Sequence, residues 1–422
     1  MQKMDQIICF LFCITLPIMT ASADNKDKIG IHGFVSQGYL KTNHNNYLLD
    51  SEDGSFEFNE AAVNFSTQLT NNLRLGLQLF SRDFGSVGNN AFFLDWAYGD
   101  YHFQDEFGVR LGKIKVPVGL NNQERDVDLL RNPIILPQSV YWEGMRDFTL
   151  AIQGLSAYGS VSLKNMGRMD YEFFGGSLTV PEPKSLLWQQ LFYQLTDTIN
   201  QQLPEGSKSK IRDPAVNGEY VIGGSIKWST PLSGLRLATS YATGKVKLSS
   251  DVEVIIPIAE ISPGVNLNNV IVEEFDADVK FDNYNTYSLE YSLENFKLVC
   301  EYLFQGYEVQ TIEKTLRYEG QGYYGQINYR PLEWMELSSY YSIFYPRKSD
   351  KNGDQLVQDG NPRYMAWQKD ACFTLRFDLN INWLIKFEAH FIDGCGQVFQ
   401  VNNPDGMERY FNLYGVKTTY NF

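Results

Sequence analysis

Apolar and polar residues alternate along most of the chain, and the last residues show the pattern most simply. Phe422, Tyr420 and Val416 fall on one face of an extended strand, whereas the residues between them are polar or glycine. Successive side chains of a β-strand point to opposite faces, so this period of two predicts a strand that continues to the carboxyl terminus. The same alternation recurs in the segments 72–84, 296–309 and 383–396.

Sixteen such segments can be counted, and many have ten or more residues, which is long for a soluble sheet. Ten residues at about 3.3 Å each, tilted by about 40°, rise about 25 Å, the height of the apolar band of a membrane barrel. The predicted strands are 28–41, 55–68, 72–84, 91–103, 107–116, 147–161, 168–180, 218–230, 235–248, 278–293, 296–309, 316–329, 334–346, 366–379, 383–396 and 408–422.

The connections between these strands differ in length in a regular way. Every second one is short, and most of the intervening ones are long, which is typical of outer-membrane barrels with an even strand number. We therefore predict an all-β fold, a transmembrane antiparallel β-barrel of 16 strands with short periplasmic turns and long external loops. The short connections are 70–72, 104–106, 163–167, 231–234, 294–295, 330–333 and 380–382, and the long ones are 42–54, 117–146, 181–217, 249–277, 347–365 and 397–407.

The first 23 residues have the pattern of a secretory signal peptide. Lys3 precedes the apolar run "IICFLFCITLPIM", and the small residues "ASA" follow it. We expect residues 1–23 to be cleaved and residues 24–422 to form one barrel in the outer membrane of a Gram-negative-type bacterium. The lipid bilayer is then one partner. The barrel assembly machinery is another, because outer-membrane proteins commonly end in an alternating strand with a terminal aromatic residue, here Tyr420 and Phe422.

Charge and cysteine content narrow the class of protein further. The net charge of −14 argues against binding to nucleic acid or to anionic lipid headgroups. Three widely spaced cysteines remain after residue 23, an odd number that predicts free thiols rather than a disulfide framework. These cysteines are Cys300, Cys372 and Cys395.

The polar faces of the predicted strands describe the interior of the barrel. Sixteen strands leave room for an aqueous channel, and charged residues on the inner faces need water or one another. We predict a hydrated lumen on this basis. The charged residues assigned to it are Arg74, Arg82, Asp95, Arg110, Lys227, Arg236, Lys297, Glu301, Asp370, Arg376, Lys386, Glu388 and Lys417.

The connection 117–146 follows the fifth predicted strand, where 16-stranded porins have a loop that folds inward and narrows the pore. Opposed acids and bases across such a constriction create a transverse field that orients polar solutes. The alternative is an ordinary solvated outer loop. The residues predicted to form the constriction are Arg110, Lys113, Lys115, Glu124, Arg125, Asp126, Asp128, Arg131, Glu143 and Arg146.

The segment "RLGKIKVPVGLNN", which leads into this loop, resembles the strand-to-constriction segment of the phosphate-selective porin O and P family. The specific part of the resemblance covers roughly residues 107–147, and a looser one extends over the barrel. It implies a homotrimeric 16-stranded channel. It also implies that Lys113, Lys115 and the loop up to Arg146 shape the constriction.

The segment 248–279 departs from that family. Its predicted loop, residues 249–277, contains no lysine or arginine, whereas phosphate-selective members draw anions in through basic residues. An acidic external loop raises the local cation concentration and repels phosphate, so we expect weak cation preference or little preference. The acids are Asp251, Glu253, Glu260, Glu273, Glu274, Asp276 and Asp278.

Residues 185–203 break the strand pattern. Leu187, Leu191 and Leu195 recur every four residues, with prolines on both sides, which predicts an amphipathic helix inside an external loop. The helix could cap the barrel, contact a neighbouring subunit, enter the lumen or pack on its own loops.

No other chemistry is evident from residue spacing. The four histidines have no metal-ligand spacing, and no nucleotide-binding or hydrolase motif is present. We predict no cofactor, no metal site and no enzymatic activity. The predicted function is passive diffusion of small hydrophilic solutes or ions through a porin. The alternatives are a phosphate- or anion-selective porin, or a structural or adhesive barrel with a blocked lumen.

Overall fold

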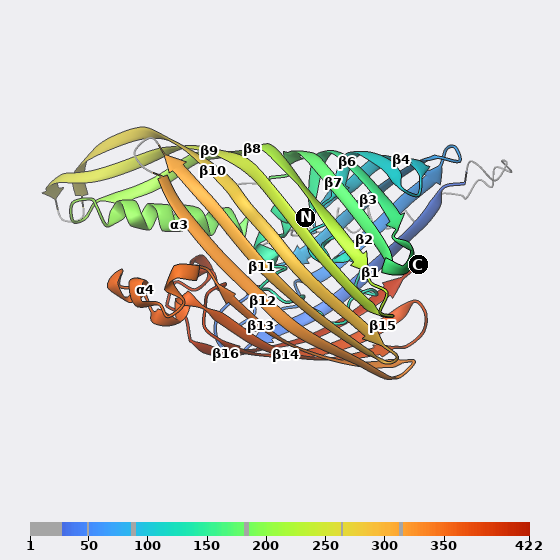
Figure 1. Cartoon of the computed structure of the whole chain (residues 1–422). Coiled ribbons are helices and arrows are strands. Elements are labelled where there is room, and N and C mark those ends of the chain that lie inside the picture. The colour runs from blue at the N-terminus through green and yellow to red at the C-terminus, as the bar shows by residue number, and fades with distance from the viewer. Residues whose placement is uncertain (1–27, 49, 86–89, 181–184, 263–264, 312–314) are drawn as a thin grey trace, which may run out of the picture.

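The computed structural model describes residues 28–48, 50–85, 90–180, 185–262, 265–311 and 315–422 (Figure 1). The expected signal peptide, residues 1–23, lies outside this range. Among the described residues, no helix has both the length and the apolar composition needed to cross a bilayer.

The described strands form one closed antiparallel barrel, and each pairs with its neighbours in sequence. The prediction of a 16-stranded transmembrane barrel is confirmed. The strands are β1 (Gly30–Thr42), β2 (Phe58–Gln68), β3 (Leu73–Phe84), β4 (Phe92–Gln104), β5 (Phe107–Lys115), β6 (Ala151–Ser162), β7 (Arg168–Leu178), β8 (Lys208–Ser229), β9 (Leu235–Ser262), β10 (Val265–Leu293), β11 (Phe296–Thr311), β12 (Thr315–Leu332), β13 (Met335–Tyr345), β14 (Gln368–Asp378), β15 (Trp383–Asp393) and β16 (Tyr410–Asn421).

The barrel closes between its first and last strands. β1 pairs with β16 in a register that places Phe34 opposite Asn421. The ladder continues to the last residue, because Phe422 N–H donates to Gly33 O at 2.9 Å and Gly33 N–H donates to Phe422 O at 2.9 Å. Gly33 is required here, since a β-carbon would lie 2.4 Å from the backbone carbonyl oxygen of Ala62. The terminal aromatic residue is therefore part of the closing seam, which leaves no open edge in lipid.

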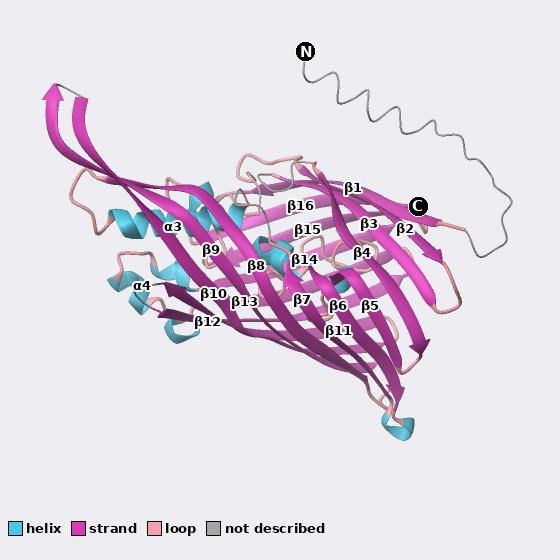
Figure 2. Cartoon of the chain, turned by 90° about the horizontal axis from the view of Figure 1, so that it is seen from above, coloured by secondary structure: helices cyan, strands magenta, loops and turns pink. Residues whose placement is uncertain are grey.

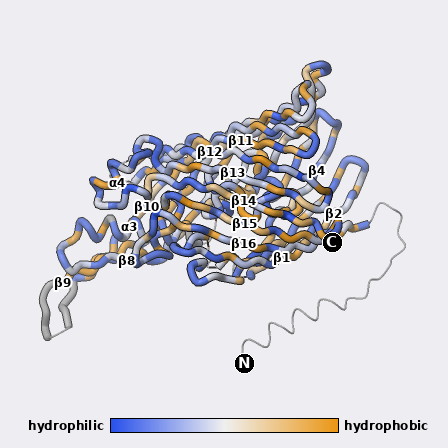
Figure 3. The backbone as a smooth tube through the Cα atoms, turned by 90° about the horizontal axis from the view of Figure 1, so that it is seen from below, coloured by the Kyte–Doolittle hydropathy of each residue, from blue (hydrophilic) through white to orange (hydrophobic). Residues whose placement is uncertain are grey.

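The two faces of the wall differ as the alternation predicts. Figure 3 shows hydrophobic and hydrophilic residues alternating along the strands from β13 to β16. Apolar side chains that face outward stay exposed, as Leu111 at 67% and Phe373 at 55% illustrate. Lys386, Lys417 and Thr419 face inward and are fully buried. An apolar outer band with a polar interior is the arrangement that a bilayer requires of a barrel.

Short connections gather at one end of the barrel and long ones at the other (Figures 1 and 2). We call these the short-turn end, where Phe422 lies, and the long-loop end. The helical segments are η2 (Asn122–Glu124), η3 (Glu143–Met145), α2 (Arg146–Thr149), η4 (Lys164–Met166), α3 (Leu186–Asn200), η5 (Lys348–Asp350), α4 (Asp354–Gln358), η6 (Arg363–Ala366) and η7 (Gln400–Asn402).

The prediction of an external loop at 249–277 is wrong. β9 continues to Ser262 and β10 begins at Val265, so this segment is a long hairpin that extends beyond the long-loop end (Figures 1 and 2). The reason is its content of β-branched residues, such as the run from Val270 to Val272, which favours extended pairing over a loop. The acids of this segment concealed that preference.

The acidic hairpin has basic neighbours on β8 that the sequence alone did not indicate. β8 begins at Lys208, ten residues before the predicted strand, and its added part pairs with β9. This register sets Lys210 opposite Glu253 and Arg212 opposite Asp251, and Arg212 forms an ion pair with Glu253. Basic residues of β8 therefore compensate part of the acidic charge on the hairpin.

The predicted amphipathic helix is present as α3, and it packs against its own chain. Trp188 is buried and its ring meets Phe148 edge-on, with ring centroids 5.3 Å apart. The same apolar cluster contains Val246 and Leu248 of β9 and Val279 of β10. Of the four placements considered from the sequence, the structure shows packing on its own strands and loops.

Candidate functional site

The connection between β5 and β6, residues 116–150, lies inside the barrel; we call it the lumen loop. Its Glu143 forms an ion pair with Arg82 of β3 at 3.4 Å, and its Leu120 N–H donates to Glu301 of β11 at 2.9 Å. β3 and β11 lie on opposite sides of the ring of strands. The lumen loop therefore crosses the interior from wall to wall.

The first anchor of the lumen loop is the buried ion pair of Asp128 with Lys386 of β15. Lys386 Nζ lies 3.0 Å from Asp128 Oδ1 and also donates to the backbone carbonyls of Asp128 and Arg131. Both side chains are 0% exposed. Burial alone raises the pKa of Asp128, but Lys386, Lys417 and Arg131 outweigh it and hold the pKa below its ordinary value. This carboxylate is charged and paired.

A second anchor uses backbone groups of the lumen loop. Glu388 of β15 accepts hydrogen bonds from the N–H groups of Ile134 at 2.7 Å and Ile135 at 2.9 Å. Arg376 of β14 donates to the carbonyl of Leu129 at 2.8 Å. Backbone groups that leave water must be paired, and these wall residues supply the partners because no strand or helix does.

Apolar packing supports the same part of the lumen loop. Ile134 and Ile135 are almost fully buried in a cluster with Leu40 of β1 and Phe411 and Leu413 of β16. Full burial of an isoleucine side chain contributes about 1.5–3 kcal/mol. We define the anchor wall as β14, β15 and β16, the strands that bind residues 128–135.

A third anchor lies across the lumen, around Glu301 of β11. Its carboxylate accepts hydrogen bonds from Tyr141 Oη at 2.5 Å, Tyr324 Oη at 2.6 Å, Ser288 Oγ at 2.5 Å and the Leu120 N–H at 2.9 Å. Burial, followed by the charge of Glu301, raises the pKa of Tyr141 well above its usual value. The tyrosine is therefore a proton donor that holds the loop.

The centre of the lumen loop carries a network of opposite charges. Arg146 lies 2.6 Å from Asp126, and Lys115 lies 3.0 Å from the other oxygen of that carboxylate. The guanidinium also stacks on the Phe80 ring and lies 3.6 Å from Asp95. Burial raises the pKa of Asp126, but Arg146 and Lys115 together lower it below its ordinary value. The acids and bases neutralise one another at contact distance.

Among the remaining residues of the predicted constriction, two form ion pairs and two have other surroundings. Arg125 forms an ion pair with Glu143 at 2.6 Å, and Arg131 lies 3.4 Å from Asp128. Lys113 donates to a backbone carbonyl of β4 at 2.6 Å, whereas Glu124 is exposed. Most of the predicted constriction charges are thus brought together as internal pairs of the lumen loop.

Four of the predicted residues lie away from the lumen loop: Arg74, Arg110, Arg236 and Lys297. Glu290 of β10 pairs with Arg236 at 2.5 Å and with Lys297 at 2.8 Å. Arg74 is exposed near the short-turn end of β3. Arg110 pairs with Glu172 at 3.1 Å, next to the open part of the interior.

A cavity of about 500 Å³ runs beside the lumen loop; we call it the side hollow. It extends from the turn between β4 and β5 to Pro117 and Gln123 of the lumen loop, along β6, β7 and β8. We define β6, β7 and β8 as the open wall. The charged residues that line the side hollow are Asp105, Glu106, Asp170 and Glu172 with Arg168 and Lys227.

Of these six charged residues, only Lys227 was predicted from the sequence to face the lumen. Asp170 and Glu172 alternate with outward residues along β7, so the period of two was a usable signal for them. Asp105 and Glu106 lie in a short turn, where no periodicity indicates which way a side chain points. Only the closed barrel brings these two parts of the chain to one cavity.

Comparisons with known proteins identify the fold. No protein-family model matches the chain, and no curated protein matches it. Solved structures match along almost the whole chain. The outer membrane channel DcaP of Acinetobacter baumannii has a TM-score of 0.53 at 10% identity, covering 94% of this chain and 97% of that one. OmpF of Salmonella typhi, in complex with daunomycin, has a TM-score of 0.54 at 11% identity, covering 94% and 98%.

An anion-selective porin from Comamonas acidovorans also matches, with a TM-score of 0.50 at 13% identity and coverage of 94% and 99%. At this level of identity the likeness concerns the fold, which is that of 16-stranded porins. The resemblance to the phosphate-selective porin O and P family is not confirmed.

Proposed function

We propose that the protein is an outer-membrane porin through which small hydrophilic solutes or ions diffuse passively, with the lumen loop as its constriction. The observation that carries the proposal is the side hollow, a charged cavity that leads from the short-turn end to the lumen loop. A 16-stranded barrel has room for water in its interior. Passive diffusion requires no catalytic group or cofactor, and the proposal includes none.

We place the protein in the outer membrane of a Gram-negative-type bacterium. The exposed apolar side chains on the outer face support contact with lipid, and the paired carboxyl-terminal strand supports insertion by the barrel assembly machinery. A cleaved signal peptide at residues 1–23 is part of this proposal. So is a homotrimer, on the family resemblance.

We infer weak cation preference. The side hollow is lined by four acidic and two basic residues, and an excess of acidic groups raises the local cation concentration. The two lysines that the resemblance assigns to the constriction are engaged in other contacts, since Lys115 pairs with Asp126 and Lys113 bonds to a carbonyl. These contacts argue against strong phosphate binding at the constriction.

A structural or adhesive barrel with a blocked lumen is the second candidate. The observation that favours it is the attachment of the lumen loop to strands on opposite sides of the ring, from Arg82 to Glu301. A porin conducts ions across a bilayer, whereas a barrel with a blocked lumen does not.

The test is to record refolded protein in a planar bilayer under a KCl gradient and then add phosphate. We expect stepwise conductance, a reversal potential near zero or on the cation side, and no block by phosphate. Anion selectivity with phosphate block would overturn the inferred preference while leaving a channel. A folded barrel without conductance would overturn the channel and favour the blocked lumen.

A further inference from the structure

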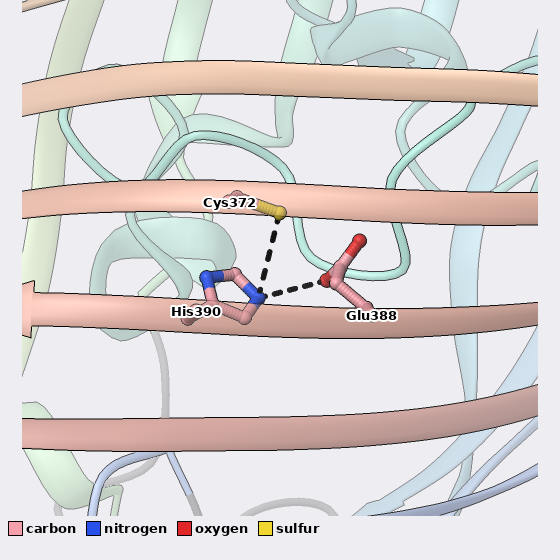
Figure 4. Close-up of side chains that lie close together, drawn as sticks. All are labelled: Cys372, Glu388 and His390. Carbon is pink, nitrogen blue, oxygen red and sulfur yellow. Dashed lines mark hydrogen bonds and ion pairs between the residues drawn. The ribbon is translucent and has the colours of Figure 1, made fainter.

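Three potential metal ligands meet on the anchor wall, behind the lumen loop. Cys372 of β14 lies directly opposite His390 of β15, and Glu388 precedes His390 by two residues and so shares its face. All three side chains are buried. Figure 4 shows them close together on two neighbouring strands. Spacing along the sequence could not reveal this group, because strand pairing creates it.

The geometry of this group is compact. His390 Nε2 lies 2.9 Å from Glu388 Oε1 and 3.8 Å from Cys372 Sγ. Dashed lines in Figure 4 mark both contacts. The ligating atoms of all three residues lie within 4.8 Å of one another. One metal ion bound to sulfur at about 2.3 Å and to nitrogen and oxygen at about 2.0 Å can reach all three with small adjustments.

Asp370 contacts the His390 ring on the side opposite Cys372 and Glu388. Its carboxylate lies 2.9 Å from His390 Nδ1, the ring nitrogen that faces away from Cys372 and Glu388. Histidines that bind metals commonly donate their other N–H to a carboxylate, which fixes the ring and makes it a stronger ligand. This partner is what distinguishes the cluster from a chance contact of polar side chains.

We propose that Cys372, Glu388 and His390 form a binding site for a divalent transition-metal ion of the zinc class, with Asp370 as the positioning residue for His390. Sulfur, imidazole and carboxylate are the ligands that zinc takes in proteins. Metal binding displaces the thiol proton of Cys372 and any proton on His390 Nε2, while Nδ1 keeps its contact with Asp370.

The site is coupled to the lumen loop through Glu388. One oxygen of this carboxylate, Oε2, accepts from the Ile134 N–H and from Thr374, whereas Oε1 faces His390 and the Ile135 N–H. A metal ion on Oε1 leaves the bonds of Oε2 in place. Bound metal therefore stiffens the anchor of the lumen loop and stabilises the folded barrel, whether or not the barrel conducts.

The test is to refold the full chain with Co²⁺ or Zn²⁺, remove free metal by dialysis, and measure metal content and the near-ultraviolet spectrum. We expect about one ion per barrel and a sulfur-to-cobalt charge-transfer band, because a thiolate is among the ligands. Cys372→Ser should abolish the band. Cys300→Ser is the matched control, since Cys300 is an exposed thiol on β11, away from the cluster, and it should leave the band unchanged.

Asp370→Asn tests the positioning role and should weaken metal affinity by about 10–100-fold while the charge-transfer band persists at saturating cobalt. Folding of each variant is checked by its heat-dependent shift on a gel. If a variant fails to fold, the wild-type spectrum alone still shows whether the barrel binds metal through a thiolate. A folded wild-type barrel that retains no metal, or shows no charge-transfer band, overturns the proposal. So does a band that persists in Cys372→Ser.

Discussion

The anchor wall and the open wall use the same kinds of residue for different purposes. Lys386 on the anchor wall is fully buried and bonds to Asp128 and to two carbonyls of the lumen loop. Lys227 on the open wall lines the side hollow and keeps part of its surface exposed. Both are inward-facing lysines on barrel strands. They differ because the lumen loop covers Lys386, whereas Lys227 faces the side hollow.

Charged residues in the same lumen therefore have two roles, one in stability and one in the electrostatic field of the channel. A buried charge is costly unless it is paired and hydrogen-bonded, so a charge beneath the lumen loop contributes to folding. A charge beside water is screened and contributes little to stability, but its field acts on passing ions. The predictions below separate these two roles.

The largest expected effect is the loss of an anchor. Lys386→Met leaves Asp128 and two loop carbonyls without their main partner and should lower the free energy of unfolding by about 3–5 kcal/mol. The measurement is denaturant unfolding of the purified barrel. Lys227→Met is the matched control and should change it by less than about 0.5 kcal/mol. Equal effects of the two substitutions would remove the distinction between the walls.

The anchor across the lumen should give a smaller effect. Glu301→Gln keeps the shape but loses the charge that accepts four hydrogen bonds, which should cost about 1.5–3 kcal/mol. Thermal unfolding followed by circular dichroism measures the loss. The control is Glu290→Gln, whose partners Arg236 and Lys297 are about half exposed; its cost should stay within about 1 kcal/mol.

The pH dependence should follow from the lowered pKa of Asp126. A carboxylate whose folded pKa lies below its unfolded value of 3.8 contributes stability that is complete above that value and is lost as pH falls through the folded pKa. The difference in unfolding free energy between wild type and Asp126→Asn should therefore be constant from about pH 7 to pH 4 and shrink below. A difference that already shrinks between pH 7 and pH 5 would contradict the paired carboxylate.

The smallest expected effect concerns selectivity. Lys227→Glu adds negative charge to the side hollow and should raise the cation-to-anion permeability ratio, by less than about tenfold, without changing stability. Reversal potentials in a KCl gradient measure it, and Lys227→Met should give an intermediate value. An unchanged ratio would place the ion path outside the side hollow.

The strands could be predicted from the sequence because their signal is local. A period of two in segments such as 383–396 depends only on which face meets lipid, so all 16 strands and the closing pair at Phe422 followed from it. The hairpin of β9 and β10 was missed because its acids masked its β-branched residues. Charge composition indicates exposure, but it does not exclude strand pairing.

The site could be predicted only in part, for a different reason. The sequence indicated which residues of the lumen loop are charged, such as Asp126 and Arg146, but not which partner each one meets. Those partners lie far apart in the sequence, 258 positions for Asp128 and Lys386. Only closure of the barrel brings them together. The same closure places Cys372 opposite His390, which no local spacing reveals.

The most direct test compares single-channel recordings of wild type, Lys386→Met and Lys227→Glu in one bilayer system. Lys386→Met should change the amplitude or noise of the conductance steps, because the lumen loop is loosened, and should leave the reversal potential unchanged. Lys227→Glu should shift the reversal potential and leave the steps steady. The opposite assignment of effects, or a wild-type barrel that never conducts, would contradict the division of the lumen into an anchoring side and a conducting side.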